Sequence, residues 1–291
     1  MKKFFLIAAA AVFALVACDN KENGENEENT VPEVKTCAEN LVLYMPFEGA
    51  DNAVKVGEGL TFDKKAGAAD FGAGYIGKGY VNTSGKNDEA YLKFKLAANN
   101  AISKLENVTI TVWVKNVEEF QKGGLFSANG KHFATQDWPS MVVMFDNKSV
   151  DDETGTKNQQ INGRLMFKTA EGAETNMWLD TWDTAFAKYG SWFQFAFTYD
   201  AASGAWALYV DGVQVKTAEY GDKMKFGGCV PADANAFYVG GWSSWIESYT
   251  GAQDWQSFFA GSIDELRMYN KVLTEAEIQA LRREEVAIAL S

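Results

Sequence analysis

Histidine is almost absent from this chain, which contains a single one, His132. A catalytic site of the Ser-His-Asp or Cys-His type would have to use that residue. It lies in the polar stretch "NGKHFATQDW", which has no nucleophile motif, and the chain has no H-E-x-x-H pattern or histidine-rich cluster. We therefore interpret His132 as a loop residue and expect no histidine-based catalytic or metal site.

Positive charge is also scarce. The chain has 27 Lys and Arg against 39 Asp and Glu, a net charge of −12. Nucleic-acid-binding proteins present a basic patch or stripe, and no such stripe is built here, so we expect no nucleic-acid partner. Apolar and aromatic residues are plentiful, at 47% and 14%, which is ample for the core of one all-β domain of about 250 residues.

Long apolar runs are absent apart from the segment Phe4–Val16, which follows Lys2 and Lys3. A helix that crosses a bilayer needs about 20 apolar residues, so this run is too short to be one. A short basic region followed by a short apolar run is typical of a secretory signal peptide. We assign residues 1–17 to that role.

The junction "LVAC", ending at Cys18, resembles the lipobox of bacterial lipoproteins, in which the cysteine becomes the lipidated first residue. The alternative is an ordinary signal peptide. Residues 18–37 are acidic and mostly polar, and such a segment cannot bury enough surface to order itself, so we expect a disordered tether. Its acidic start resembles the export signal of Bacteroidetes surface lipoproteins, and a plain solvated linker is the alternative. We expect a lipid anchor in the outer membrane, with the domain (residues 38–291) periplasmic or surface-exposed.

Two cysteines remain after Cys18, namely Cys37 and Cys229. Cys37 stands just before the first expected strand and Cys229 just before a late one. Disulfides persist in exported proteins. The sequence favours a Cys37–Cys229 bridge that fixes the start of the domain, and two free thiols are the alternative.

Strand patterns dominate the domain. In "NVTITVWVK" the even-numbered residues from Val108 to Val114 share one face, and "YLKFKLA" alternates in the same way. "WFQFAFTYD", "GAWALYV" and "VQVKT" form an expected meander, with Asp211-Gly212 as a two-residue hairpin turn. Short strands with frequent turns predict an antiparallel β-sandwich or jelly roll.

The last expected strand, "GSIDELRMYN", contains an unusual acid. Simple alternation places Asp264 on one face with Leu266 and Met268, and the intervening residues on the other face. An ionised Asp on a core face is costly unless it is paired. A short C-terminal helix should follow, because Thr274 and Glu277 have the spacing of a capping box.

Five stretches in order resemble the concanavalin A-like, laminin-G-type β-sandwich family of bacterial surface proteins. They are "LVLYMPFEG", "GYIGKGYVNTSGKNDEAYLKF", "NVTITVWVK", "SWFQFAFTYDAASGAWALYVDGVQV" and "FFAGSIDELRMYNKVLTEAEIQAL". The resemblance implies two curved antiparallel sheets in a jelly roll. It implies little about activity, because this fold carries lectins, binding modules, lyases and hydrolases.

The resemblance also implies a structural Ca²⁺ between the first and last strands. Many such jelly rolls hold the ion with an Asp of the last strand and backbone carbonyls, and Ca²⁺ takes six to eight oxygen ligands. Asp264 is the first candidate ligand and Glu48 the second. The alternative is that Asp264 accepts hydrogen bonds from backbone N–H groups or an Arg.

Tryptophans in polar loops are the main clue to binding. Trp138, Trp178, Trp182, Trp242, Trp245 and Trp255 all lie outside the clear strand centres. Exposed aromatic groups usually mark a contact surface, and sugar rings stack on them. The alternative is that these rings fold back and cap the sandwich. The sequence predicts a non-catalytic carbohydrate-binding lipoprotein.

Two other functions remain open. The E-x-D-x-x-E pattern of one jelly-roll hydrolase family is absent, so a glycoside hydrolase or lyase would need carboxylates from distant strands. A protein-interaction or adhesion module is the third possibility.

Overall fold

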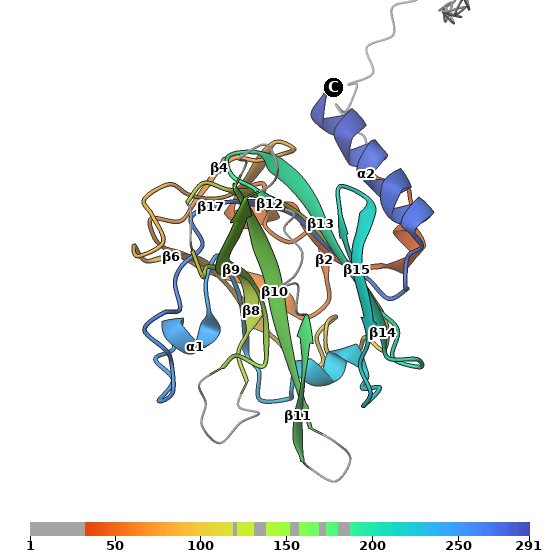
Figure 1. Ribbon diagram of the computed structural model, residues 1–291. Coiled ribbons are helices and arrows are strands. Elements are labelled where there is room, and N and C mark those ends of the chain that lie inside the picture. The colour runs from red at the N-terminus through yellow and green to blue at the C-terminus, as the bar shows by residue number, and fades with distance from the viewer. Residues whose placement is uncertain (1–32, 119–120, 131–137, 152–156, 169–172, 180–186) are drawn as a thin grey trace, which may run out of the picture. The chain divides into compact units, whose positions relative to one another are not determined.

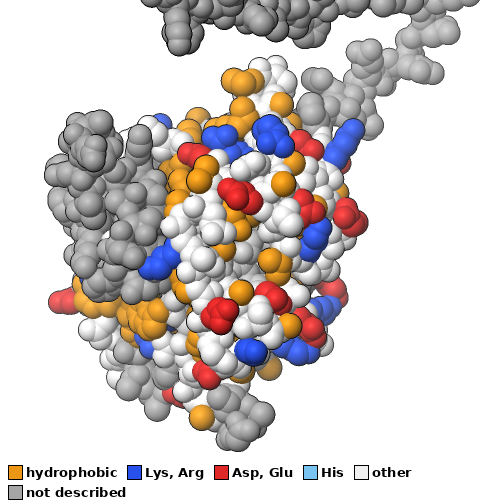
Figure 2. All heavy atoms as spheres, turned by 45° about the vertical axis from the view of Figure 1, so that its right-hand side comes forward, with side chains coloured by type: hydrophobic (Ala, Val, Ile, Leu, Met, Phe, Trp, Pro, Cys, Tyr) orange, Lys and Arg blue, Asp and Glu red, His pale blue; other side chains and the backbone are white. Residues whose placement is uncertain are grey.

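The computed structural model describes residues 33–118, 121–130, 138–151, 157–168, 173–179 and 187–291 (Figure 1). Within this part of the chain, two antiparallel sheets pack face to face as a β-sandwich, which confirms the expected fold class. Cys18, His132 and Trp182 lie outside the described residues, so the expectations placed on them stay predictions. Figure 2 shows acidic and basic side chains interspersed on one face of the molecule.

The described strands form one sheet of nine and one of eight. The nine-stranded sheet runs in the order β15 (Val213–Glu219), β14 (Ala205–Val210), β13 (Trp192–Tyr199), β7 (Val108–Asn116), β17 (Gly261–Tyr269), β1 (Leu41–Met45) and β2 (Val56–Gly57), with β5 (Lys78–Asn82) on β17 and β4 (Asp70–Ala73) on β5. The eight-stranded sheet runs β11 (Glu174–Leu179), β10 (Lys157–Lys168), β9 (Met141–Asp151), β8 (Gly124–Ala128), β16 (Ala236–Val239), β6 (Ala90–Leu96) and β3 (Leu60–Gly67), with β12 (Ala187–Lys188) on β10.

Helices are few among the described residues. The short ones are η1 (Ala38–Asn40), η2 (Ala50–Asn52), η3 (Phe226–Cys229) and α1 (Ser243–Ile246), and the long one is α2 (Glu275–Ala289). None of the helices in the described ranges is long and apolar enough to span a bilayer.

The main core lies between the two sheets. On β7, Val108, Ile110, Val112 and Val114 all point into it, as the alternation predicted. The meander β13–β14–β15 is also confirmed, and its second turn places both Asp211 and Gly212 at positive φ. Positive φ at both central residues is what a two-residue hairpin that matches strand twist requires.

The last strand corrects the predicted alternation. Its register against β7 shifts between Asp264 and Arg267, and Glu265 has φ 55°, so one extra residue is inserted there. Such a β-bulge changes which face the following side chains occupy. Ile263 therefore shares the core face with Leu266 and Met268, and Asp264 points to the outer face of the sheet.

Helix α2 covers that outer face, on the right of Figure 1. The predicted capping box is present: the Glu277 N–H donates to the Thr274 hydroxyl, and the Thr274 N–H donates to the Glu277 carboxylate. Leu273 and Ile278 both pack in the cluster beneath the helix. The described part of the chain begins at Glu33, and close to this start the Glu284 carboxylate accepts hydrogen bonds from the Lys35 and Thr36 N–H groups.

The structure does not contain the expected Cys37–Cys229 bridge, since both cysteines are free. Cys229 is fully buried in the core between the sheets. Cys37 packs with α2 on the outer face of the nine-stranded sheet, where its thiol contacts Glu277. The sheet separates the two environments, so proximity to strand ends in the sequence did not translate into proximity of the two sulfur atoms.

Candidate functional site

The outer face of the eight-stranded sheet carries a continuous row of side chains from one edge toward the other. On β9, Val143 and Phe145 point into the core, so Val142 and Met144 point outward. The cross-strand partners of Val142 on the neighbouring strands also point outward, and so do their own partners further along the sheet. Together these residues form a row across the outer face. In order it comprises Trp178, Arg164, Val142, Ser127, Tyr238, Lys93 and Lys64.

Residues 241–258 lie across the middle of this row. The Ser243 N–H donates to the Ser127 hydroxyl, which donates in turn to the Gly241 carbonyl, so the segment is fixed to β8. Trp242 packs with Val142 and Met144, and Trp255 packs against the same cluster. The segment therefore divides the outer face into a tryptophan-bearing part over β9–β11 and a tyrosine-bearing part over β16 and β6.

Four of the predicted tryptophans come together on the first part. The Trp138 ring centroid lies 5.2 Å from that of Trp178, 5.2 Å from that of Trp242 and 5.5 Å from that of Trp255. Trp242 and Trp255 are 5.4 Å apart, edge to face. We refer to these four residues as the tryptophan cluster.

The members of the cluster differ sharply in exposure. Trp242 is only 1% exposed, and its indole N–H donates to the Lys122 carbonyl over 2.7 Å. Trp138 and Trp255 are half-buried, whereas Trp178 is 40% exposed. Trp242 is thus a supporting residue, as the fold-back alternative proposed, and Trp178 is the most exposed ring of the cluster.

Arg164 completes the cluster and was missed at the level of sequence. Its guanidinium carbon lies 4.6 Å from the Trp138 ring centroid and 4.8 Å from that of Trp178. The Lys122 ammonium lies 4.7 Å from the Trp255 ring centroid. All three distances fall within the range of cation–π attraction, so the cluster pairs aromatic rings with positive charge. The pairing of Arg164 with Trp178 is revealed only by the strand register, which places the two residues opposite one another.

Of the two remaining predicted tryptophans, the structure describes only Trp245, which is not part of this cluster. Trp245 lies on α1 and is 36% exposed, and among the described residues it makes none of the ring contacts that join the cluster. Trp182 lies outside the described residues.

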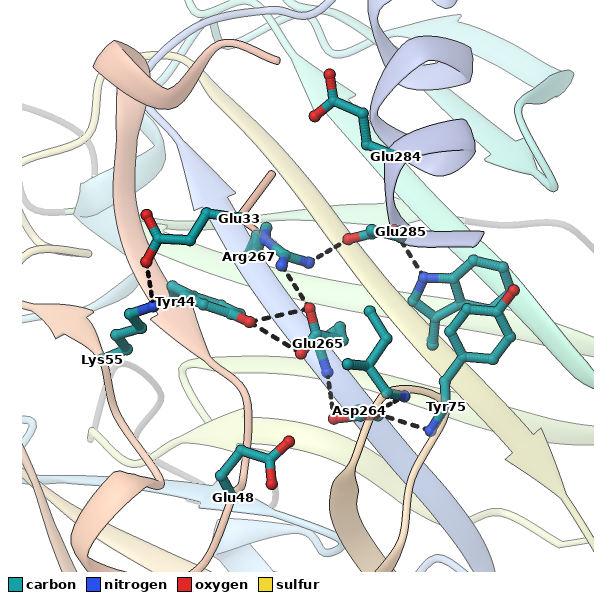
Figure 3. A network of polar contacts seen from close by, with 12 residues as sticks. Glu33, Tyr44, Glu48, Lys55, Tyr75, Asp264, Glu265, Arg267, Glu284 and Glu285 are labelled. Atoms are coloured by element: carbon teal, nitrogen blue, oxygen red, sulfur yellow. Dashed lines mark hydrogen bonds and ion pairs between the residues drawn. The ribbon is translucent and has the colours of Figure 1, made fainter. Parts of the chain in front are cut away.

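Asp264 is held by backbone donors. Its Oδ2 atom accepts hydrogen bonds from the N–H groups of Tyr75 and Ile76 at 2.8 and 2.9 Å, and its Oδ1 atom accepts one from the Glu265 N–H at 2.8 Å (Figure 3). Burial and the neighbouring Glu265 carboxylate raise the pKa of Asp264. The Tyr75 and Ile76 N–H groups hold the β4–β5 turn on the last strand, and backbone donors to Asp264 are the alternative that the sequence left open.

This arrangement does not fit a calcium ion. Three N–H donors aim at the Asp264 oxygens, where Ca²⁺ would require oxygen ligands. The Glu48 carboxylate accepts from the Lys78 N–H at 3.2 Å. The described residues contain no group of three or more His, Cys, Asp or Glu placed to hold a metal.

A buried ionic network lies beside Asp264. Arg267 forms ion pairs with Glu265 on its own strand and with Glu285, which α2 brings down onto the sheet (Figure 3). Glu285 also accepts hydrogen bonds from the Trp113 indole N–H at 2.7 Å and the Gln194 amide at 2.6 Å. Burial raises the pKa of Glu285 to about 7, outweighing the opposing effect of Arg267.

These carboxylates are sealed from solvent. Asp264 and Glu285 are fully buried and Glu265 is 1% exposed. Glycoside hydrolysis requires two carboxyl groups that flank a bound sugar. The network cannot receive a sugar while α2 is docked on the sheet. Its role is therefore structural, because it holds the helix and the hairpin on the sheet.

Two packed antiparallel sheets over one core define a concanavalin A-like β-sandwich. Residues 85–279 match the family model Laminin_G_3, described as the concanavalin A-like lectin/glucanases superfamily, and the chain belongs to this family. The resemblance drawn from the sequence motifs is thereby confirmed.

Similar solved structures include domain 4 of an extracellular GH43 arabinanase from Geobacillus stearothermophilus in complex with arabinotriose. The identity is 19%, the alignment covers 83% of this chain and 97% of that chain, and the TM-score is 0.49. The binding domain of botulinum neurotoxin DC also matches. In its complex with SialylT the identity is 13%, 85% of this chain and 51% of that chain are covered, and the TM-score is 0.54. In its complex with rat synaptotagmin II the identity is 12%, 86% of this chain and 52% of that chain are covered, and the TM-score is 0.53. This chain spans about half of the neurotoxin chains. At these identities the likeness shows the fold alone. A comparison with curated proteins gave no match.

Proposed function

We propose that the protein binds carbohydrate without catalysis, at the tryptophan cluster on the outer face of the eight-stranded sheet. The observation that carries this proposal is the exposed ring of Trp178, supported by Trp138 and Arg164. Binding sites for small molecules combine aromatic surface with a few placed polar groups, and this cluster has that composition.

The cluster is suited to binding because its support is built in advance. Trp138 contacts the three other rings, and Trp242 is fixed by packing on β9 and by its hydrogen bond to Lys122. A ring already held in place loses little side-chain freedom when a ligand stacks on it. The C–H face of a sugar ring can therefore stack on Trp178 at a low entropic cost.

The proposal includes attachment through a lipid on Cys18. The described chain starts at Glu33, and residues 34–37 pack with α2 on the outer face of the nine-stranded sheet. The tryptophan cluster lies on the outer face of the opposite sheet. A tether would therefore join the domain at the sheet that does not carry the cluster.

An array of oligosaccharides probed with the purified protein tests the proposal. We expect selective binding to one glycan class and no release of reducing ends from it. Absence of binding to every glycan would overturn the proposal, and release of reducing sugar would favour the hydrolase alternative.

A further inference from the structure

The second part of the outer face carries two lysines directly opposite one another. Beyond Ser127 the row continues through Tyr238 on β16 to Lys93 on β6 and Lys64 on β3, and Lys93 and Lys64 are cross-strand partners. Like charges in that position repel, so the pair weakens the sheet unless something compensates for it.

Aromatic rings form the floor beneath these lysines. The Lys64 ammonium lies 5.5 Å from the Tyr91 ring centroid, and the Lys93 ammonium lies 5.7 Å from that of Tyr238. Tyr91 and Tyr238 pack edge to face, and the Phe258 ring stacks near Tyr91. All three rings are nearly buried, so the lysines lie over a fixed floor.

Neighbouring lysines on the same strands form ion pairs, and these two do not. Lys65 of β3 pairs with Asp70 at 2.6 Å, and Lys95 of β6 pairs with Asp63 at 3.2 Å. Within the described ranges neither Lys64 nor Lys93 forms an ion pair. The Glu89 and Asp63 carboxylates act on Lys64 only from beyond ion-pair distance, so two adjacent cations remain without a direct ion pair in a chain with a net charge of −12.

We propose that Lys64 and Lys93 form an anion subsite, and that the glycan bound by this face is acidic. The inference rests on the proposed function and specifies its ligand class. One carboxylate or sulfate placed between the two ammonium groups would relieve their repulsion and accept a charge-assisted hydrogen bond from each. Four strand spacings of about 4.8 Å separate Lys93 from Arg164 along the row. Because residues 241–258 lie between the two sites, a glycan that occupies both would pass over that segment.

Calorimetric titration with matched ligands tests the subsite. Oligogalacturonide, the same oligosaccharide as its methyl ester, and a sulfated oligosaccharide would be compared for the wild-type protein. We expect an anionic form to bind at least about tenfold more tightly than the ester, the effect of one hydrogen bond to a charged group, and the advantage to shrink with added salt. The preferred anion, carboxylate or sulfate, identifies the acidic group.

The double variant Lys64→Gln/Lys93→Gln should abolish the preference for the anionic form. Lys104→Gln/Lys225→Gln is the matched control, because it removes the same charge from two exposed lysines that pair with Glu58 and Glu106. Equal affinity for acid and ester in the wild type would overturn the inference and leave carbohydrate binding standing. Equal loss of anion preference in both double variants would also overturn it, since net charge alone would then explain the preference.

Discussion

Arg164 and Trp178 are directly opposed across β10 and β11, and the guanidinium carbon lies 4.8 Å from the indole ring centroid. The same guanidinium lies 4.6 Å from the Trp138 ring centroid, so it links an exposed ring to a half-buried one. This relationship fixes the one strongly exposed ring of the tryptophan cluster in a defined orientation.

Replacement of Arg164 by Ala should weaken glycan binding about tenfold, because cation–π support worth roughly 1–2 kcal/mol is removed from Trp178. Arg164→Lys should retain part of the affinity, since a cation remains but the planar group is lost. Titration calorimetry measures both. Unchanged affinity in Arg164→Ala would show that Trp178 does not depend on the guanidinium.

Trp242→Ala should destabilise the protein by about 3–5 kcal/mol, because a large buried ring is removed from a packed site. Trp245→Ala is the matched control. Its ring is 36% exposed, and we expect a loss of less than about 1 kcal/mol. Urea denaturation measures both, and equal losses would contradict the assigned roles.

The buried Glu285 should make stability depend on pH. Its pKa is raised from 4.5 to about 7 in the folded protein, so the folded state holds this proton more tightly than the unfolded chain. Its contribution is therefore fully present below about pH 4.5 and declines as the pH rises toward 7. Unfolding free energies measured across this window should show a smaller decline in Glu285→Gln. An identical pH profile in the variant would contradict the assignment.

Chelation should leave the melting temperature unchanged, because Asp264 is satisfied by three backbone N–H donors. Asp264→Ala should lower stability by about 2 kcal/mol with or without added Ca²⁺, since buried donors lose their partner. Thermal unfolding with EDTA and with Ca²⁺ measures this. A lower melting temperature in EDTA would restore the calcium interpretation.

Much of the fold follows from the sequence because strand alternation and capping are local properties. The β7 pattern, the Asp211-Gly212 turn and the Thr274–Glu277 capping box all appear as predicted. The bulge at Glu265 could not be predicted in the same way. A positive φ is uncommon at a residue other than glycine, and the surrounding contacts impose it.

The candidate site was only partly predictable for a similar reason. Loop tryptophans stand out in the sequence, but their division into supporting and exposed rings depends on residues 241–258 lying over β8 and β9. Arg164 and the Lys64–Lys93 pair become visible only through strand register, which joins residues far apart in the chain. The Cys37–Cys229 prediction failed because linear position did not reveal which side of the sheet each thiol occupies.

The most direct test of carbohydrate binding at the tryptophan cluster is the affinity of Trp178→Ala for the preferred glycan, measured by calorimetry beside Trp245→Ala. The two rings are similarly exposed, at 40% and 36%, and only Trp178 belongs to the cluster. We predict at least a tenfold loss for Trp178→Ala, as expected when about 1.4 kcal/mol or more of stacking is removed, and unchanged affinity for Trp245→Ala. Wild-type affinity in Trp178→Ala would contradict the proposed site.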